Sequence, residues 1–176
     1  MILRSRRTVE IDRAYFDRLS GPNGAGSPYN EVIMVLPRPG GKVLVGSKYY
    51  YPHGLFRLPS GRIRPLESPE EAFLREAWEE TGLQPAIESR IAEIIHLCVC
   101  GEDSLEARSH VFLGSKTEAA PRALDSAERV NAYREIGLPE LLAIKDQLLS
   151  MFGAWQGFGR FRSHAHQVVH DYFAQT

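Results

Sequence analysis

Cysteine, net charge and long apolar segments are all scarce in this chain of 176 residues. Its two cysteines, Cys98 and Cys100, lie inside one apolar run, which favours buried thiols in a reducing compartment over a disulfide or a metal site. The formal net charge of −1 gives no general attraction to nucleic acid or to an anionic membrane. No apolar run approaches the roughly 18 residues that a membrane-spanning helix needs, and no signal peptide is recognisable. We therefore expect a cytoplasmic protein with neither nucleic-acid nor membrane partners.

The length suits one hydrophobic core with extensions. We predict an N-terminal extension over residues 1–28, a main domain over 29–152 and a C-terminal helical extension over 153–176. The first extension reads as a short strand and a helical turn within residues 1–20, followed by a linker at Gly21–Pro28 that is rich in turn-forming residues. Because these residues precede the main domain, we hypothesise that they mediate a homodimer.

Apolar, β-branched runs alternate with turn residues and predict a sheet. Strands are predicted at Glu31–Pro37, Lys42–Lys48, Arg90–Cys100, Ala107–Gly114 and Glu128–Ile136. A Pro-Gly-Gly turn at 39–41 joins the first two, and the third and fourth resemble an antiparallel pair. Amphipathic helices are predicted at Leu138–Met151 and Arg162–Phe173, with the glycine-rich Gly153–Arg160 as a break between them.

One further helix is predicted at Pro69–Thr81 from its end signals. Ser68 is a suitable N-cap, Glu71 completes a capping box, and Gly82 follows the last turn. Apolar residues recur one helical turn apart and predict a stripe that packs against a sheet: Phe73 with Ala77, and Leu74 with Trp78. Strands on both sides of this central helix predict an α/β fold, an α/β/α sandwich around a mixed β-sheet.

Acidic residues gather on the same helix. Glu76, Glu79 and Glu80 are spaced so that their carboxylates project from one side, and Glu67 adds a fourth acid just before the helix. Backbone carbonyls of the preceding turn, Ser60–Pro65, can approach the same point. Such oxygen ligands suit Mg²⁺, which usually shares its coordination shell with substrate phosphates. A solvated acidic surface is the alternative interpretation.

The order of these residues resembles a known family motif. Gly61, Glu67 and the segment Arg75–Leu83 fit GX5EX7REUXEEXGU, the Nudix box, at every fixed position, with Ala77 at the first aliphatic position. Among the neighbouring residues, Ser60 and Arg64 differ from those common in the family. The resemblance implies the Nudix fold over about residues 31–151.

The resemblance also implies a metal-dependent hydrolase of phosphoanhydride bonds that uses Mg²⁺ or Mn²⁺. The implied metal ligands are Glu67, Glu76, Glu79, Glu80 and the backbone carbonyl of Gly61. The general base is expected to be Glu76 or Glu79, with Glu128 as a more distant alternative. Arg75 is expected to orient a carboxylate of the box rather than touch the substrate.

The substrate implied is a small nucleoside diphosphate linked to a further group, such as ADP-ribose, a nucleotide sugar or a nucleoside triphosphate. Tyr51, Phe56 and Arg62 are the candidate substrate-binding residues. The aromatic cluster that contains Tyr51 and Phe56 either anchors the loop by packing or forms a wall on which a base stacks. Two alternative functions remain open at this point. One is a catalytically silent, nucleotide-sensing module of the same fold, and the other is an RNA 5′-end pyrophosphohydrolase, for which a basic surface would be expected.

Overall fold

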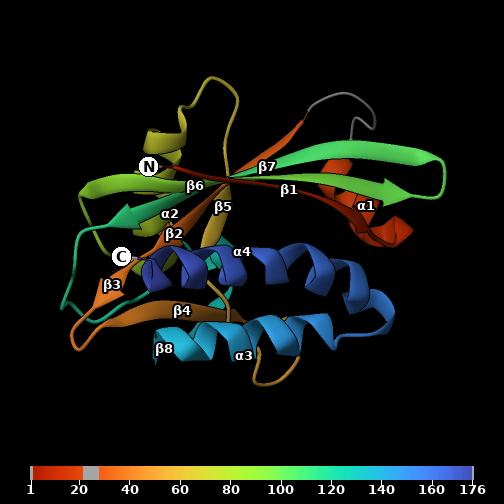
Figure 1. Cartoon of the computed structure of the whole chain (residues 1–176). Helices are drawn as coiled ribbons and strands as arrows, with labels where there is room; N and C mark the ends of the chain where they lie inside the picture. The colour runs from red at the N-terminus through yellow and green to blue at the C-terminus, as the bar shows by residue number, and fades with distance from the viewer. Residues whose placement is uncertain (1, 22–27, 176) are drawn as a thin grey trace.

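A computed structural model describes residues 2–21 and 28–175, and its elements are arranged around two sheets (Figure 1). In chain order the elements are β1 (Leu3–Glu10), α1 (Arg13–Ser20), β2 (Tyr29–Val35), β3 (Pro37–Arg38), β4 (Lys42–Lys48), β5 (Ser60–Arg62), α2 (Pro69–Thr81), β6 (Ile87–Cys100), β7 (Asp103–Gly114), β8 (Val130–Gly137), α3 (Leu138–Leu149) and α4 (Gln156–Ala174). Short 3₁₀ segments lie at Ser126–Glu128 and Gly153–Trp155. The predicted Gly21–Pro28 linker includes residues 22–27, which lie outside the described residues.

The larger sheet is mixed and has the strand order β1-β6-β7-β2-β5. β1 runs parallel to β6 and β2 parallel to β7, whereas β6 with β7 and β2 with β5 are antiparallel. β6 and β7 thus form the predicted antiparallel hairpin. The smaller antiparallel sheet has the order β3-β4-β8. The prediction of a mixed sheet flanked by helices is confirmed.

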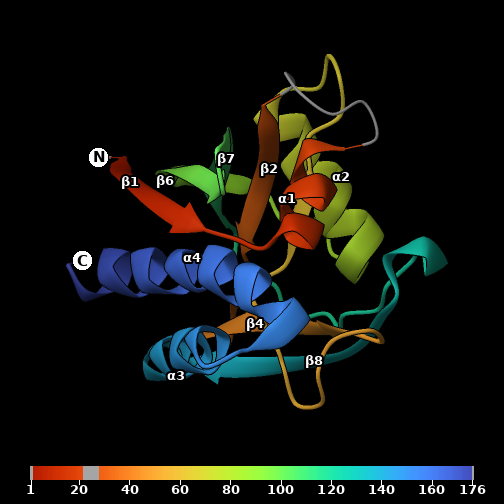
Figure 2. The same cartoon turned by 90° about the vertical axis from the view of Figure 1, so that its right-hand side faces the viewer.

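Both faces of the larger sheet are covered. Along β2, Val32 and Met34 belong to the core beneath α2, while Ile33 and Val35 belong to the core on the opposite face. This alternation follows the two-residue period of a strand. α4 lies between the larger sheet and the layer that contains α3 and β4, as Figures 1 and 2 show. β2 is therefore packed on both of its faces.

The N- and C-terminal segments are integral to this packing. β1 and α1 confirm the strand and helical turn predicted within residues 1–20, and Val9, Ile11 and Phe161 belong to the same hydrophobic core as the strands of both sheets. Whether residues 29–152 form a separate domain stays a prediction. None of the helices in the described part of the chain combines the length and apolar character that crossing a membrane requires.

Two details of the predicted connections are wrong. The turn at residues 39–41 joins β4 to the two-residue strand β3, so β2 and β4 lie in different sheets. The predicted break at Gly153–Arg160 ends early, because α4 already begins at Gln156. A Cβ at Gly159 would lie 2.0 Å from the Leu148 carbonyl oxygen, so this glycine permits close packing of α4 rather than ending a helix.

Candidate active site

Helix α2 carries the acidic residues of the site, and its ends are fixed by local signals. The Ser68 side chain accepts a hydrogen bond from the Glu71 backbone, and the Glu71 side chain accepts one from Ser68, so the predicted capping box is present. Of the two predicted stripes, Phe73 and Ala77 are fully buried. The other stripe is a wrong prediction, since Leu74 and Trp78 are 48% and 44% exposed. Glu76 and Glu80 are buried as well, and they lie beside the Phe73–Ala77 stripe on the side of the helix away from Leu74 and Trp78.

Gly61 on β5 lies directly against the Glu76 carboxylate. A Cβ built on Gly61 would lie 1.8 Å from Glu76 Cδ and 2.1 Å from its Oε2, closer than non-bonded atoms can approach. Any larger residue at position 61 would therefore displace this carboxylate. The side chain of Glu76 is thereby confined between β5 and α2 and is only 5% exposed.

Arg75 connects three of the acids. Its Nε and one terminal nitrogen donate to the two carboxylate oxygens of Glu67 at 2.6 and 2.8 Å. Its other terminal nitrogen donates to Glu76 at 2.6 Å and to Glu79 at 2.9 Å. It also donates to the backbone carbonyl of Arg62 at 3.0 Å. These contacts agree with the expected orienting role of Arg75, because a rigid, planar guanidinium fixes the carboxylates that share it.

Glu80 has a different environment from the other acids of the helix. It is fully buried and lies 2.7 Å from the ammonium of Lys48, which also contacts Glu128 at 2.9 Å. Lys48 therefore holds Glu128, from the segment before β8, against the acids of α2. One carboxylate oxygen from each of Glu76, Glu79 and Glu128 lies within 4.8 Å of the others. Glu128 thus joins the site to which the sequence could assign it only as an alternative.

Burial raises the pKa values of these acids, whereas Arg75 and Lys48 lower them. Burial raises the pKa of Glu76 to about 7, although Arg75 acts against that rise. Hydrogen bonding to Arg75 holds the pKa of Glu67 below its usual value. For Glu128, the penalty of burial is outweighed by Lys48, and its pKa is lowered. The site therefore combines two carboxylates of lowered pKa, Glu67 and Glu128, with Glu76 and Glu80, whose pKa values burial raises.

The acids line a cleft of about 650 Å³. Its walls comprise Pro28, Asn30, Arg62, Ile63, Arg64, Pro65, Leu66, Glu67, Arg75, Glu76, Glu79 and Glu128. A cleft of this volume accommodates a small-molecule ligand. Three converging carboxylates offer only oxygen donors, the ligands that hard divalent cations prefer, so the residues present fit a Mg²⁺ or Mn²⁺ ion.

The three candidate substrate-binding residues do not lie together. Arg62 lines the acidic cleft, and Arg62 and Tyr51 both line a second pocket. Phe56 lies on neither wall: it is buried and packs under the guanidinium of Arg134, 4.2 Å from the ring centroid. The Tyr51 hydroxyl accepts a 2.6 Å hydrogen bond from Arg57, and its ring packs on Tyr50 and Phe158.

Sequence reasoning missed two cations of the site, Lys48 and Arg64. Lys48 ends a strand, and its position gave no sign that the chain would bring Glu80 and Glu128 to it. Arg64 donates to Glu79 at 3.2 Å. Of the histidines of α4, His166 takes part in the packing, since its Nε2 accepts a hydrogen bond from the Leu58 backbone N–H at 3.2 Å.

The two cysteines form no disulfide with each other, as favoured from the sequence. Cys98 and Cys100 are free, with Cys98 buried and Cys100 partly buried. Burial raises the pKa of the Cys98 thiol to about 12, so it stays protonated and unreactive at neutral pH.

Comparison with known proteins places this site in a family context. The family model described as NUDIX domain matches residues 28–152. An RNA pyrophosphohydrolase of Roseobacter denitrificans is 36% identical over 67 residues, which cover 38% of this chain and 42% of the relative. A Bacillus subtilis protein named "Putative 8-oxo-dGTP diphosphatase" is 40% identical over 63 residues, covering 36% of this chain and 38% of the relative. The chain thus matches about two fifths of the length of these curated relatives.

A solved structure supports the fold over a longer stretch. A NUDIX hydrolase from Nitrosomonas europaea has a TM-score of 0.54 and 21% identity, and the match covers 85% of this chain and 90% of that one.

Proposed function

The chain belongs to the NUDIX domain family, and on that premise we propose that it is a metal-dependent hydrolase of a small nucleotide. The bond cleaved is the diphosphate of a nucleoside diphosphate-linked compound, and the products are a nucleoside monophosphate and a phosphorylated or pyrophosphate product. The observation that carries this proposal is the convergence of Glu76, Glu79 and Glu128 within 4.8 Å at the wall of the acidic cleft.

We assign a role to each acidic residue of the site. Glu76, Glu79 and Glu128 hold a divalent cation, with Glu67 and the Gly61 carbonyl as further ligands. Glu80, also expected from the sequence to be a ligand, contacts Lys48 and acts through it on Glu128. When bound, Mg²⁺ or Mn²⁺ neutralises diphosphate oxygens and lowers the pKa of a bound water.

Side chains of the protein accept the proton and orient the carboxylates. Glu76 is our candidate for the group that accepts the proton of the attacking water, since its carboxylate lies on the wall of the cleft and is held in place by Gly61 and Arg75. Arg75 holds Glu67, Glu76 and Glu79 in one fixed arrangement, which reduces the reorganisation that the reaction would otherwise require.

A substrate panel tests this function. Turnover with Mg²⁺ is measured by phosphate release, with phosphatase coupling where a monophosphate is formed, on ADP-ribose, nucleotide sugars, NADH, dinucleoside polyphosphates and nucleoside triphosphates including 8-oxo-dGTP. We expect a clear preference that a chelator abolishes and that Glu79→Gln reduces at least about 100-fold. Silence across the panel with nucleotide binding retained would refute hydrolysis and support the sensing module.

A second candidate is supported by one comparison. The relative from Roseobacter denitrificans is an RNA pyrophosphohydrolase, so a 5′-triphosphorylated RNA joins the panel. The net charge of −1 argues against an RNA substrate, because phosphate contacts dominate RNA affinity and need a basic surface. Faster turnover of the RNA than of every small nucleotide would make RNA pyrophosphohydrolysis the favoured function.

A further inference from the structure

A pocket of about 250 Å³ lies next to the acidic cleft, with Arg62 on the wall of both. Tyr15 and Arg18 of α1, Arg57 of the segment before β5, and Arg162 of α4 complete much of its wall. α1 and α4 meet at this pocket, where the ring of Tyr15 packs edge-on against that of Phe158. Both helices fall outside residues 28–152, the part that matches the NUDIX family, so part of the pocket wall comes from segments outside that match.

The pocket carries positive charge that the protein does not balance. Arg162 is paired with Glu31 at 2.5 Å. Arg18, Arg57 and Arg62, by contrast, have no carboxylate within ion-pair distance among the residues that the structure describes. Arg57 is nevertheless only 6% exposed and is held by the Tyr51 hydroxyl, the Leu58 carbonyl and Ser60. Arg18 and Arg62 are exposed. Arg57 makes its direct contacts with neutral groups, although the more distant Glu80 also stabilises its charge, so a negatively charged ligand in the pocket would stabilise it further.

Two residues of the pocket wall also have hydrogen-bond donors without a partner among the described residues. Within the described residues, the hydroxyl of Tyr15 and Nε of Arg162 are buried and have no hydrogen-bond partner. Tyr15 is 6% exposed, and its burial raises the pKa of the hydroxyl to about 12, so it remains a proton donor. Buried polar groups are almost always satisfied. Both residues line the cationic pocket, and a ligand rich in acceptors is the kind that would satisfy these two donors.

We propose that this pocket binds a phosphate-type oxyanion of the substrate, separate from the diphosphate held at the acidic cleft. The substrate then carries an additional phosphate, and a compound with an uncharged sugar at that position binds less well. The oxyanion site itself does not require hydrolysis, but its assignment to the substrate rests on the proposed function.

Binding of inorganic phosphate tests the site directly. Calorimetric titration in EDTA removes any metal-held phosphate from the measurement. We expect Tyr15→Phe to weaken binding about fivefold, as one lost hydrogen bond would, and Arg18→Gln about tenfold, as a lost charge-assisted contact would. Tyr49→Phe and Arg6→Gln are matched controls, because both residues are exposed and neither lines the pocket.

The Tyr15→Phe variant separates binding from structure. Its hydroxyl has no partner in the described structure, so its removal leaves the resistance to urea unchanged or slightly improved. A loss of phosphate affinity at unchanged stability supports the proposal. No phosphate binding by the wild type, or equal weakening in the controls, overturns it.

Turnover then identifies the source of the oxyanion. If the substrate supplies it, phosphate competes with the substrate, and Tyr15→Phe raises KM about fivefold with little change in kcat. Inhibition by phosphate that persists at saturating substrate would overturn the assignment to the substrate. Phosphate binding without turnover would refute the proposed hydrolysis alone, whereas turnover without phosphate binding would refute the pocket alone.

Discussion

Replacing Gly61 with alanine would test whether the close approach of β5 to α2 positions the catalytic acid. The new Cβ would overlap the Glu76 side chain, with Cδ at 1.8 Å and Cγ at 2.2 Å. The side chain can move, so the fold survives, but Glu76 must leave its place beside Glu79 and Glu128. A misplacement of about 1 Å at a reacting centre costs about 100-fold in rate, and we expect a loss of kcat of at least that size.

The stability change can be worked from the same contacts. Moving Glu76 breaks its 2.6 Å hydrogen bond with Arg75, which costs about 1.5–3 kcal/mol. Alanine recovers about 0.5–1 kcal/mol through a less flexible unfolded chain. The free energy of unfolding should therefore fall by about 0.5–2.5 kcal/mol in urea titrations, too little to explain the lost turnover.

A glycine on a strand of the smaller sheet provides the control. A Cβ at Gly46 of β4 would find its nearest neighbours at 3.9 Å, an ordinary contact distance. Gly46→Ala should keep wild-type turnover with unchanged or slightly raised stability. Wild-type kcat in Gly61→Ala, measured on the best substrate of the panel, would refute the positioning argument.

Three further predictions concern the charged network and the buried histidines. Arg75→Lys should lower kcat at least about tenfold while circular dichroism stays unchanged, because an ammonium cannot reproduce the two-oxygen contact with Glu67; an unaltered rate would contradict this. Lys48→Met should cost about 3–5 kcal/mol in urea unfolding by leaving Glu80 buried without its cation, and adding Glu80→Gln should recover much of it. Burial lowers the pKa of His166 to about 3, so the stability present above pH 6.5 is lost as the pH falls, by about 2 kcal/mol at pH 5; a His166→Gln variant with the wild-type pH dependence of stability would contradict this.

Local signals explain why the central helix could be predicted from the sequence. The capping box of Ser68 and Glu71, and Gly82 after the last turn, act within a few residues, and the observed bounds of α2 equal the predicted ones. The metal-binding candidates Glu76 and Glu79 follow from that helix, because spacing along a helix fixes the side on which they project. The same spacing could not tell that Glu80 pairs with Lys48, since that contact depends on where β4 lies.

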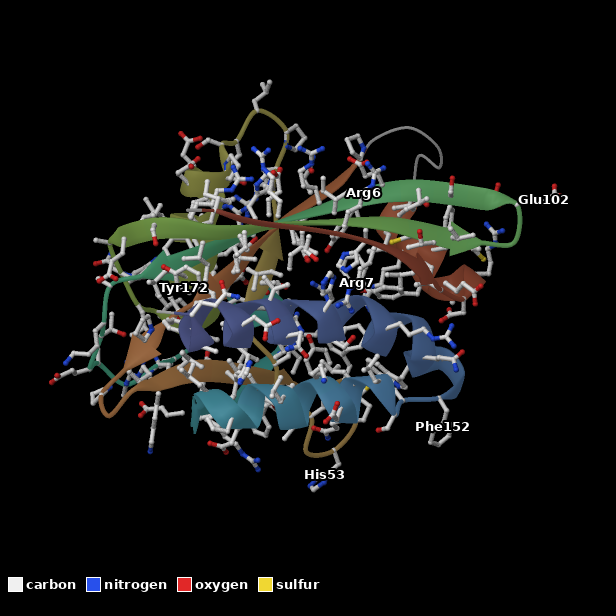
Figure 3. The ribbon with its side chains drawn as sticks, viewed as in Figure 1. Arg6, Arg7, His53, Glu102, Phe152 and Tyr172 are labelled. Carbon is white, nitrogen blue, oxygen red and sulfur yellow. The ribbon has the colours of Figure 1, made fainter. Side chains whose placement is uncertain are left out.

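Contacts between distant segments were beyond the sequence for the same reason. Leu74 and Trp78 satisfy helical periodicity as well as Phe73 and Ala77 do, and only the position of the sheet decides which stripe is buried. The side-chain contact that brings Glu128 to the site is likewise made through Lys48 of another strand. Figure 3 illustrates the density of such contacts between the sheets and α4, where Arg7 of β1 extends toward the helix while Arg6 points away from it.

Contacts made by Arg62 fix the position of the oxyanion pocket relative to the acidic cleft. The Arg62 carbonyl accepts from Arg75, which orients the acids, while the Arg62 side chain donates to the Leu19 carbonyl at the end of α1. A substrate group bound among Arg62, Arg18 and Tyr15 is therefore placed at a fixed offset from the carboxylates. Because α1 and α4 lie outside the family match, substitutions there should change which substrate is preferred while the acids and their metal affinity stay the same. The panel repeated with Tyr15→Phe tests this: an unchanged ranking of substrates would show that selectivity lies within residues 28–152.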